Sequence, residues 1–205
     1  MARWETRAGA FDRRKSGDCA GMEPVDFFAL LDLPRNAHVD EALLRDRYHE
    51  RVRVLIDPTT GGGEEGRMLH QVYEVLADPV QRLRHLLQLA APGRQGGGAA
   101  LSGDLLEIFP KVGAALSRAD GLLGRLLQTS SALGRAVLAV EEAEAQMTLQ
   151  NVLATLSAKW DEETSRLPQV AATDPEALES ALGRLRVIQK WKAEVQARLL
   201  KFLAA

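Results

Sequence analysis

The spacing of apolar residues between positions 26 and 89 limits what this chain can fold into more than any other feature. These residues recur every three or four positions, which places them along one side of a helix. Two successive stripes show the spacing: Leu44, Tyr48, Val52 and Leu55, then Leu69, Val72, Tyr73 and Leu76. The stretch therefore predicts amphipathic helices that pack against one another, and no alternating strand pattern occurs in the second half of the chain.

Aspartate and proline predict where several helices begin. Asp40 is a predicted N-cap for a helix over residues 41–55. Asp78-Pro79 and Asp174-Pro175 each pair an N-cap residue with a proline suited to the first helical position. We therefore expect new helices to start directly after both dipeptides.

A linker is predicted near the middle of the chain. The sequence APGRQGGGAA at residues 91–100 stops a helix and has the composition of a flexible connection. Beyond it we expect a helix from about Ser102, which Pro110 bends or delays, and the structure of residues 121–134 stays open. A long helix over about 135–166 follows, with these predicted inward residues: Val137, Val140, Val152, Leu156 and Trp160. The last helix is predicted over about 175–203.

These patterns predict an all-α protein in two pieces: four short helices and then an antiparallel helical bundle. We place the first piece at residues 22–91, the linker at 92–101 and the bundle at 102–205. Residues 1–21 are rich in arginine, lack the apolar core of a signal peptide and are predicted to be a disordered tail. Met22 is an alternative translation start. An arginine-rich targeting segment is a weaker reading, because acidic residues interrupt it.

Composition argues against several classes of function. The formal net charge of −2 gives no electrostatic case for binding nucleic acid or an anionic membrane. No apolar run approaches the roughly 20 residues that a membrane-spanning helix needs. The single cysteine, Cys19, cannot form an internal disulfide or a cysteine-based metal site, which fits a reducing, cytoplasmic location.

Reactive residues form no recognisable catalytic constellation, so we expect a protein that is not an enzyme and holds no cofactor or metal. His70 and His85 fall on different helices and lack a third ligand at suitable spacing. The acidic cluster Glu141, Glu142 and Glu144 cannot converge on one ion, because successive helix positions diverge by about 100°. We interpret these glutamates as a solvated face and the glycine run at 61–63 as a flexible loop.

Several motifs together resemble one family. Three segments resemble the HscB/Jac type of J-domain co-chaperone: DFFALLDLP at residues 26–34, Arg47-Tyr48 on the next helix and HQVYEVLADPVQRLRHLLQL at 70–89. A fourth segment resembles the last helix of that family: ALGRLRVIQKWKAEVQARLLKFL at 181–203. The resemblance implies an N-terminal J-domain-like helical hairpin and a C-terminal bundle. It also implies two partners: an ATPase chaperone of the DnaK/HscA type and an iron–sulfur scaffold protein of the IscU type.

The family's chaperone-binding motif is altered in this chain. The resemblance places the His-Pro-Asp tripeptide on Ile56, Asp57 and Pro58, so the histidine is absent and aspartate and proline are reversed. The resemblance makes Arg47 and Arg53 the matching basic residues of the second helix, whereas the residues alone favour a simple solvated face. We expect stimulation of a partner ATPase to be weak or absent.

The scaffold-binding surface implied by the resemblance falls on two helices. Its predicted residues are Leu105, Leu106, Phe109, Val112, Arg186 and Val187. The alternative is that these side chains fill the core of the bundle. The sequence thus supports two functions: an HscB-like co-chaperone of iron–sulfur cluster assembly, or an adaptor that has kept the fold and lost chaperone stimulation.

Overall fold

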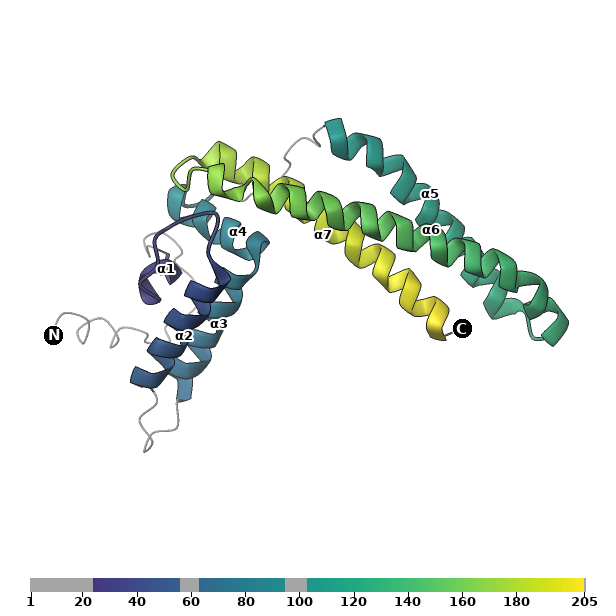
Figure 1. Ribbon diagram of the computed structural model, residues 1–205, viewed down its shortest axis with the longest axis horizontal. Helices are drawn as coiled ribbons and strands as arrows, with labels where there is room; N and C mark the ends of the chain where they lie inside the picture. The colour runs from purple at the N-terminus through teal and green to yellow at the C-terminus, as the bar shows by residue number, and fades with distance from the viewer. Residues whose placement is uncertain (1–23, 56–62, 95–102, 205) are drawn as a thin grey trace.

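The computed structural model describes residues 24–55, 63–94 and 103–204, and these ranges are helical without any strand (Figure 1). The elements in chain order are α1 (Phe27–Leu30), α2 (Glu41–Leu55), α3 (Gly63–Ala77), α4 (Pro79–Ala90), α5 (Gly103–Gln128), α6 (Ala132–Ser165), the 3₁₀ turn η2 (Leu167–Gln169) and α7 (Pro175–Ala204). The predicted all-α class is confirmed.

The predicted helix caps are present. The N–H of Leu43 donates to the Asp40 carboxylate at 2.9 Å, and that of Val80 donates to Asp78 at 2.7 Å. At the start of α7 the N–H of Glu176 donates to Asp174 at 3.0 Å. Each bond satisfies a backbone donor that the first helical turn leaves without a partner, so these three starts were correctly predicted.

The first core lies among α1–α4 and is completed by the second half of the chain. Phe28, Leu44, Leu76 and Leu83 are buried in it. Leu167 of η2 joins the same cluster, as do these residues from the start of α7: Leu178, Ala181, Leu182 and Leu185. The start of α7 therefore packs on α4, as Figure 1 shows. The predicted linker lies mostly outside the described residues, and the division into domains stays a prediction.

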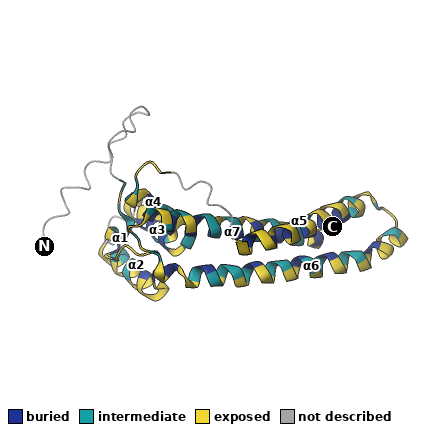
Figure 2. Ribbon diagram, turned by 90° about the horizontal axis from the view of Figure 1, so that it is seen from above, coloured by how far each residue is buried: buried dark blue, intermediate teal, exposed yellow. Residues whose placement is uncertain are grey.

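The second core runs along the elongated bundle of α5, α6 and α7, whose buried stripes face one another (Figure 2). Ion pairs fasten the helices at its edges. Arg118 of α5 lies 2.7 Å from Glu144 of α6, and Arg125 hydrogen-bonds Glu141 one heptad further on. This hydrogen bond lowers the pKa of the Glu141 carboxyl. The acidic cluster thus pairs with α5 instead of facing only solvent.

Two buried polar side chains of α4 hold the N-terminal elements in place. Arg82 donates from Nε to the carbonyl oxygen of Ala37 at 2.8 Å and from Nη1 to that of Leu76 at 2.5 Å. The Nε2 atom of His85 accepts from the N–H of Phe27 at 3.1 Å, and the rings of these two residues stack with centroids 4.2 Å apart. His85 is therefore a core residue that fixes α1.

Two predictions for the bundle are wrong. Helix α5 starts at Gly103 and continues through Pro110, so the proline does not delay the start of the helix. Because Pro110 is exposed, the carbonyl that loses its usual N–H donor there is open to water. Val137 and Val140 point outward and are 66% and 67% exposed, whereas Leu138 and Ala145 form the buried stripe of α6. Helix α6 also starts at Ala132, so residues 121–134 are the end of α5, a short turn and the first residues of α6.

Candidate protein-interaction surfaces

The basic residues of α2 are arranged in two ways. Arg45 and Arg53 are exposed, and within the described ranges neither forms an ion pair. Arg47 and Arg51 are half-buried beside the apolar stripe: Arg47 pairs with Glu50 at 3.1 Å and Arg51 pairs with Asp32 at 2.9 Å. Helical spacing alone would place Arg45 and Arg53 away from the apolar stripe and Arg47 and Arg51 beside it. The outer side of α2 thus carries Arg45 and Arg53 together with the exposed acidic residues Asp46 and Glu50, and we call the part with these arginines the basic side of α2. Arg53 lies in the last turn of the helix.

Aromatic contacts set α2 against α3. The rings of Tyr48 and Tyr73 lie with centroids 4.7 Å apart, and His70 approaches Tyr48 at 6.3 Å. The two helices form an antiparallel pair that leads into the segment carrying the altered tripeptide (Figure 1). Ile56, Asp57 and Pro58 lie outside the described residues.

The turn before α2 is tied to that helix. Asp32 adopts a left-handed backbone conformation with φ of 50°, which aspartate tolerates better than most residues. Its ion pair with Arg51 fixes this turn against α2. Asp26 caps α1 and also pairs with Arg35 at 2.8 Å. The arginines of α2 therefore sit on an anchored helix.

The structure divides the predicted scaffold-binding residues of α5 into core and surface. Leu105 and Val112 are only 2% exposed and belong to the second core. Leu106 and Phe109 are 54% and 55% exposed. The alternative that these side chains fill the core thus holds for Leu105 and Val112. Of these four residues, only Leu106 and Phe109 can contact another molecule without unfolding, and their role in scaffold binding stays a prediction.

The exposed residues of α5 adjoin α7. The rings of Phe109 and Trp191 lie with centroids 5.9 Å apart. Val187 precedes Trp191 by one helical turn and is half-buried, while Arg186 is exposed. We call Leu106, Phe109 and Val187, together with Trp191, which is 9% exposed and belongs to the second core beneath Phe109, the α5–α7 surface. Trp191 was missed from the sequence, although its spacing of four from Val187 could have indicated a shared face.

Charged residues border this surface at the start of α5. Lys159 of α6 pairs with Glu162 at 2.7 Å and with Asp104 at 3.5 Å. The hydrogen bond that Lys159 donates to the Glu162 carboxylate is the main cause that raises the pKa of the Lys159 ammonium group. The ammonium group therefore stays charged and holds the first turn of α5 against α6.

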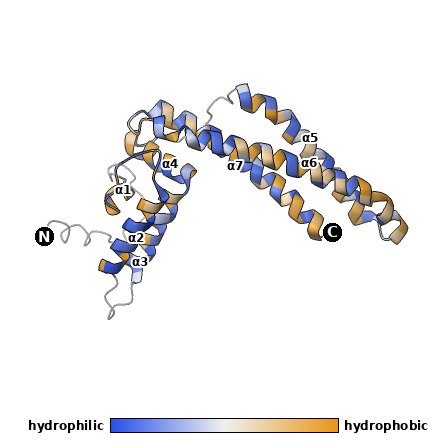
Figure 3. Cartoon of the chain, in the orientation of Figure 1, coloured by the Kyte–Doolittle hydropathy of each residue, from blue (hydrophilic) through white to orange (hydrophobic). Residues whose placement is uncertain are grey.

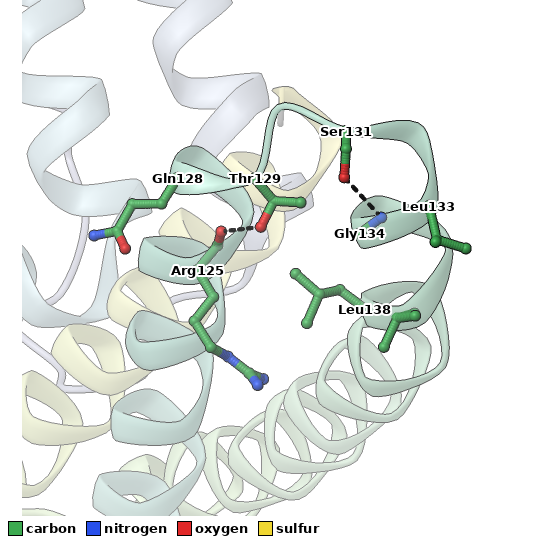
Figure 4. Close-up of a pocket in the computed structure, with 8 residues that line it drawn as sticks. Arg125, Gln128, Thr129, Ser131, Leu133, Gly134 and Leu138 are labelled. Carbon is green, nitrogen blue, oxygen red and sulfur yellow. Dashed lines mark hydrogen bonds between the residues drawn. The ribbon is translucent and has the colours of Figure 1, made fainter.

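Within the described ranges, no three histidine, cysteine, aspartate or glutamate residues are grouped to hold a metal ion. No helix of those ranges has the length and apolar run needed to cross a membrane. An open hollow of about 640 Å³ lies at the turn between α5 and α6, far from both surfaces described above (Figure 4). Among the described residues the arrangement leaves arginines exposed on α2 and apolar side chains exposed on α5.

Comparisons with known proteins give limited similarity. No protein-family model matches the sequence, and no curated protein matches it. One similar solved structure is that of the human co-chaperone protein HscB, with 17% identity and a TM-score of 0.49, covering 89% of this chain and 84% of that one. At this similarity the function has to be inferred from the chain's own residues.

Proposed function

We propose that this chain is an HscB-like co-chaperone of iron–sulfur cluster assembly. It binds a DnaK/HscA-type ATPase chaperone through the basic side of α2 and the segment that follows it. It binds an IscU-type scaffold protein through the α5–α7 surface. ATP hydrolysis is the chemistry of the chaperone, and this chain supplies orientation and energetic coupling between two binding sites.

The observation that carries the proposal is the placement of the two surfaces on parts that share a core. Arg47 and Arg53 lie on α2, whereas Leu106 and Phe109 lie on the distant bundle. The start of α7 packs into the core of the N-terminal helices, so the bundle is anchored to them by buried leucines. A scaffold protein held on the bundle would thus keep a defined position relative to a chaperone held on α2.

Exposed apolar and basic side chains suit these two roles for different reasons. Phe109 is exposed and rests against the buried ring of Trp191, so it is an aromatic anchor of the kind that dominates the binding energy of protein interfaces. Arginines on α2 favour an acidic partner surface and would make that contact sensitive to salt. The two contacts should therefore respond differently to ionic strength.

A second candidate function is favoured by one observation in the sequence. Ile56-Asp57-Pro58 stand where the family has His-Pro-Asp, and isoleucine cannot make the polar contacts of an imidazole. Such a chain would be an adaptor that binds partners without accelerating ATP hydrolysis. We expect weak or no stimulation in a single-turnover ATPase assay with the DnaK-type chaperones of the same organism, and a clear acceleration would contradict this expectation.

Binding to an IscU-type protein tests the scaffold contact. Truncating Leu106 and Phe109 together to alanine should weaken binding at least roughly tenfold, since each exposed anchor contributes about 1 kcal/mol or more. Leu200→Ala is the matched control, because Leu200 is 65% exposed on α7 and lies outside the α5–α7 surface. Equal affinities for the double variant and the control would refute the scaffold site.

Charge reversal on α2 tests the chaperone contact. Arg47→Glu with Arg53→Glu should abolish binding of the DnaK-type protein and leave scaffold binding intact. Arg67→Glu on α3 is the control, because Arg67 is exposed and belongs to a different helix. If neither partner type binds the unmodified chain, the proposed function is wrong.

A further inference from the structure

The first half of α6 carries an exposed apolar stripe that belongs to neither of the two described cores. Leu133 is 78% exposed, Val137 66%, Val140 67% and Met147 58%. They are spaced four, three and seven residues apart, so they lie along one side of the helix, away from the buried stripe. We call these four residues the outer α6 face. Figure 3 shows hydrophobic colour gathered around this end of the bundle.

The size of this face fits one side of a protein interface. Four apolar side chains of this face are more than half exposed, and the exposed Ala136 and Ala143 lie between them. At about 100 Å² per side chain, the four offer roughly 400 Å² of apolar surface. A standard interface buries about 800 Å² on each partner, of which a little over half is apolar. The face therefore supplies most of the apolar area that one partner contributes.

Charge on and around the face is already neutralised within the chain. Glu141 is hydrogen-bonded to Arg125, and Glu144 is hydrogen-bonded to Arg118 at 2.7 Å. A charged partner would have to break these pairs to gain contacts of its own. The face thus favours an apolar, uncharged counterpart.

The face is also symmetric along its own helix. Leu133 and Met147 stand at equal separations on either side of Val140. A second α6 that packs antiparallel about a two-fold axis at Val140 would place Leu133 against Met147 in both directions. Glu144 would then lie opposite Ala136, so like charges would not meet. Isologous pairing of this kind is the commonest form of protein self-association.

We propose that the outer α6 face is a homodimer interface, in which α6 of one copy packs antiparallel against α6 of another. The hollow at the α5–α6 turn is lined in part by Leu133 and Val137 and is open to solvent (Figure 4). In the antiparallel register Met147 of the second copy lies at this hollow. The interface leaves Leu106, Phe109 and α2 uncovered, so this inference stands independently of the proposed function.

Sedimentation velocity of the full chain over a wide concentration range tests the proposal. We expect the mass to rise from 22.4 kDa toward twice that value in the micromolar range, because the apolar area is at the lower end for a stable dimer. The double variant Val137→Glu, Val140→Glu should remain monomeric throughout. Leu200→Glu with Leu203→Glu is the matched control, since both leucines are exposed on α7 and should leave dimerisation unchanged.

Disulfide trapping tests the register. In a Cys19→Ser background, Val140→Cys should form a covalent dimer on oxidation, because residues on the two-fold axis of closely packed helices come within disulfide reach. Ala154→Cys, exposed on the same side of α6 but far from the axis, should not. Circular dichroism establishes that each variant is folded.

Three results would overturn the inference. The unmodified chain could stay monomeric at every concentration, as it would if the face bound a different protein. The dimer could persist in the Val137→Glu, Val140→Glu variant, which would place the interface elsewhere. Ala154→Cys could cross-link as fast as Val140→Cys, which would exclude the antiparallel register.

Discussion

Replacing Arg82 should loosen the whole N-terminal half of the molecule. Its side chain is 5% exposed and joins α4 to two other backbone segments through the carbonyl oxygens of Ala37 and Leu76. Burial lowers the pKa of its guanidinium, while Asp78 and Glu41 act in the opposite direction. The group nonetheless remains charged at neutral pH, because arginine does not deprotonate in proteins.

The expected loss can be worked out from these two bonds. A hydrogen bond from a charged donor contributes about 1.5–3 kcal/mol, so Arg82→Met removes roughly 3–6 kcal/mol and leaves two carbonyls without their donor. Removing the desolvation cost of a buried guanidinium offsets part of this loss. We expect a net decrease of about 2–4 kcal/mol in the free energy of unfolding. Arg82→Lys should recover little, since an ammonium group cannot reproduce the planar fork that reaches both oxygens.

Urea unfolding followed by circular dichroism at neutral pH measures this loss, with hydrogen exchange at Ala37 and Leu76 as a local readout. Arg84→Met is the control: Arg84 is half-buried on the same helix and bonds only the Gln81 side chain. Its expected effect is below about 0.5 kcal/mol. An Arg82→Met variant as stable as the control would refute the reasoning that these bonds anchor α4.

Two further predictions concern other positions. Burial lowers the pKa of His85 below its ordinary 6.5, with Asp26 opposing and Arg35 reinforcing the effect. The contribution of His85 to the free energy of unfolding should therefore be fully present above pH 6.5 and be lost as the pH falls below that value. The urea midpoints of wild type and His85→Gln should draw closer together over the same range. Gly134→Ala should lower the melting temperature, because an added Cβ would lie 2.5 Å from Thr129 Cγ2. Gly124→Ala, with nothing within 4 Å, should raise stability by about 0.5–1 kcal/mol; an opposite order would contradict this account.

Local features of the fold were predictable because they depend on neighbouring residues alone. Asp40, Asp78 and Asp174 cap their helices through bonds to backbone groups two or three positions on. The division of the α2 arginines between exposed and flanking positions follows from helical spacing. No long-range information is needed for either prediction.

The α5–α7 surface could be predicted only in part. Leu105 and Leu106 are adjacent and chemically identical, yet one is buried and the other exposed. Which of them faces the core depends on where α6 and α7 lie against α5, and this is a contact between segments far apart in the chain. The same dependence hid Trp191, whose role beside Phe109 comes from the parallel course of α5 and α7.

Helix α6 shows where sequence periodicity stops deciding burial. Val140 and Leu156 were both predicted to face inward, but 16 positions at about 100° each put them roughly 160° apart, so they cannot share a face. Periodicity alone could have excluded that grouping. It could not have chosen between the two stripes, since the buried one contains Ala145 and the exposed one contains the larger Val137 and Val140. The positions of α5 and α7 decide which stripe is covered, and the more apolar stripe near the α5–α6 turn is left facing outward. A stripe of that kind costs solubility unless something covers it, which is the physical reason for seeking its partner in a second copy of the chain.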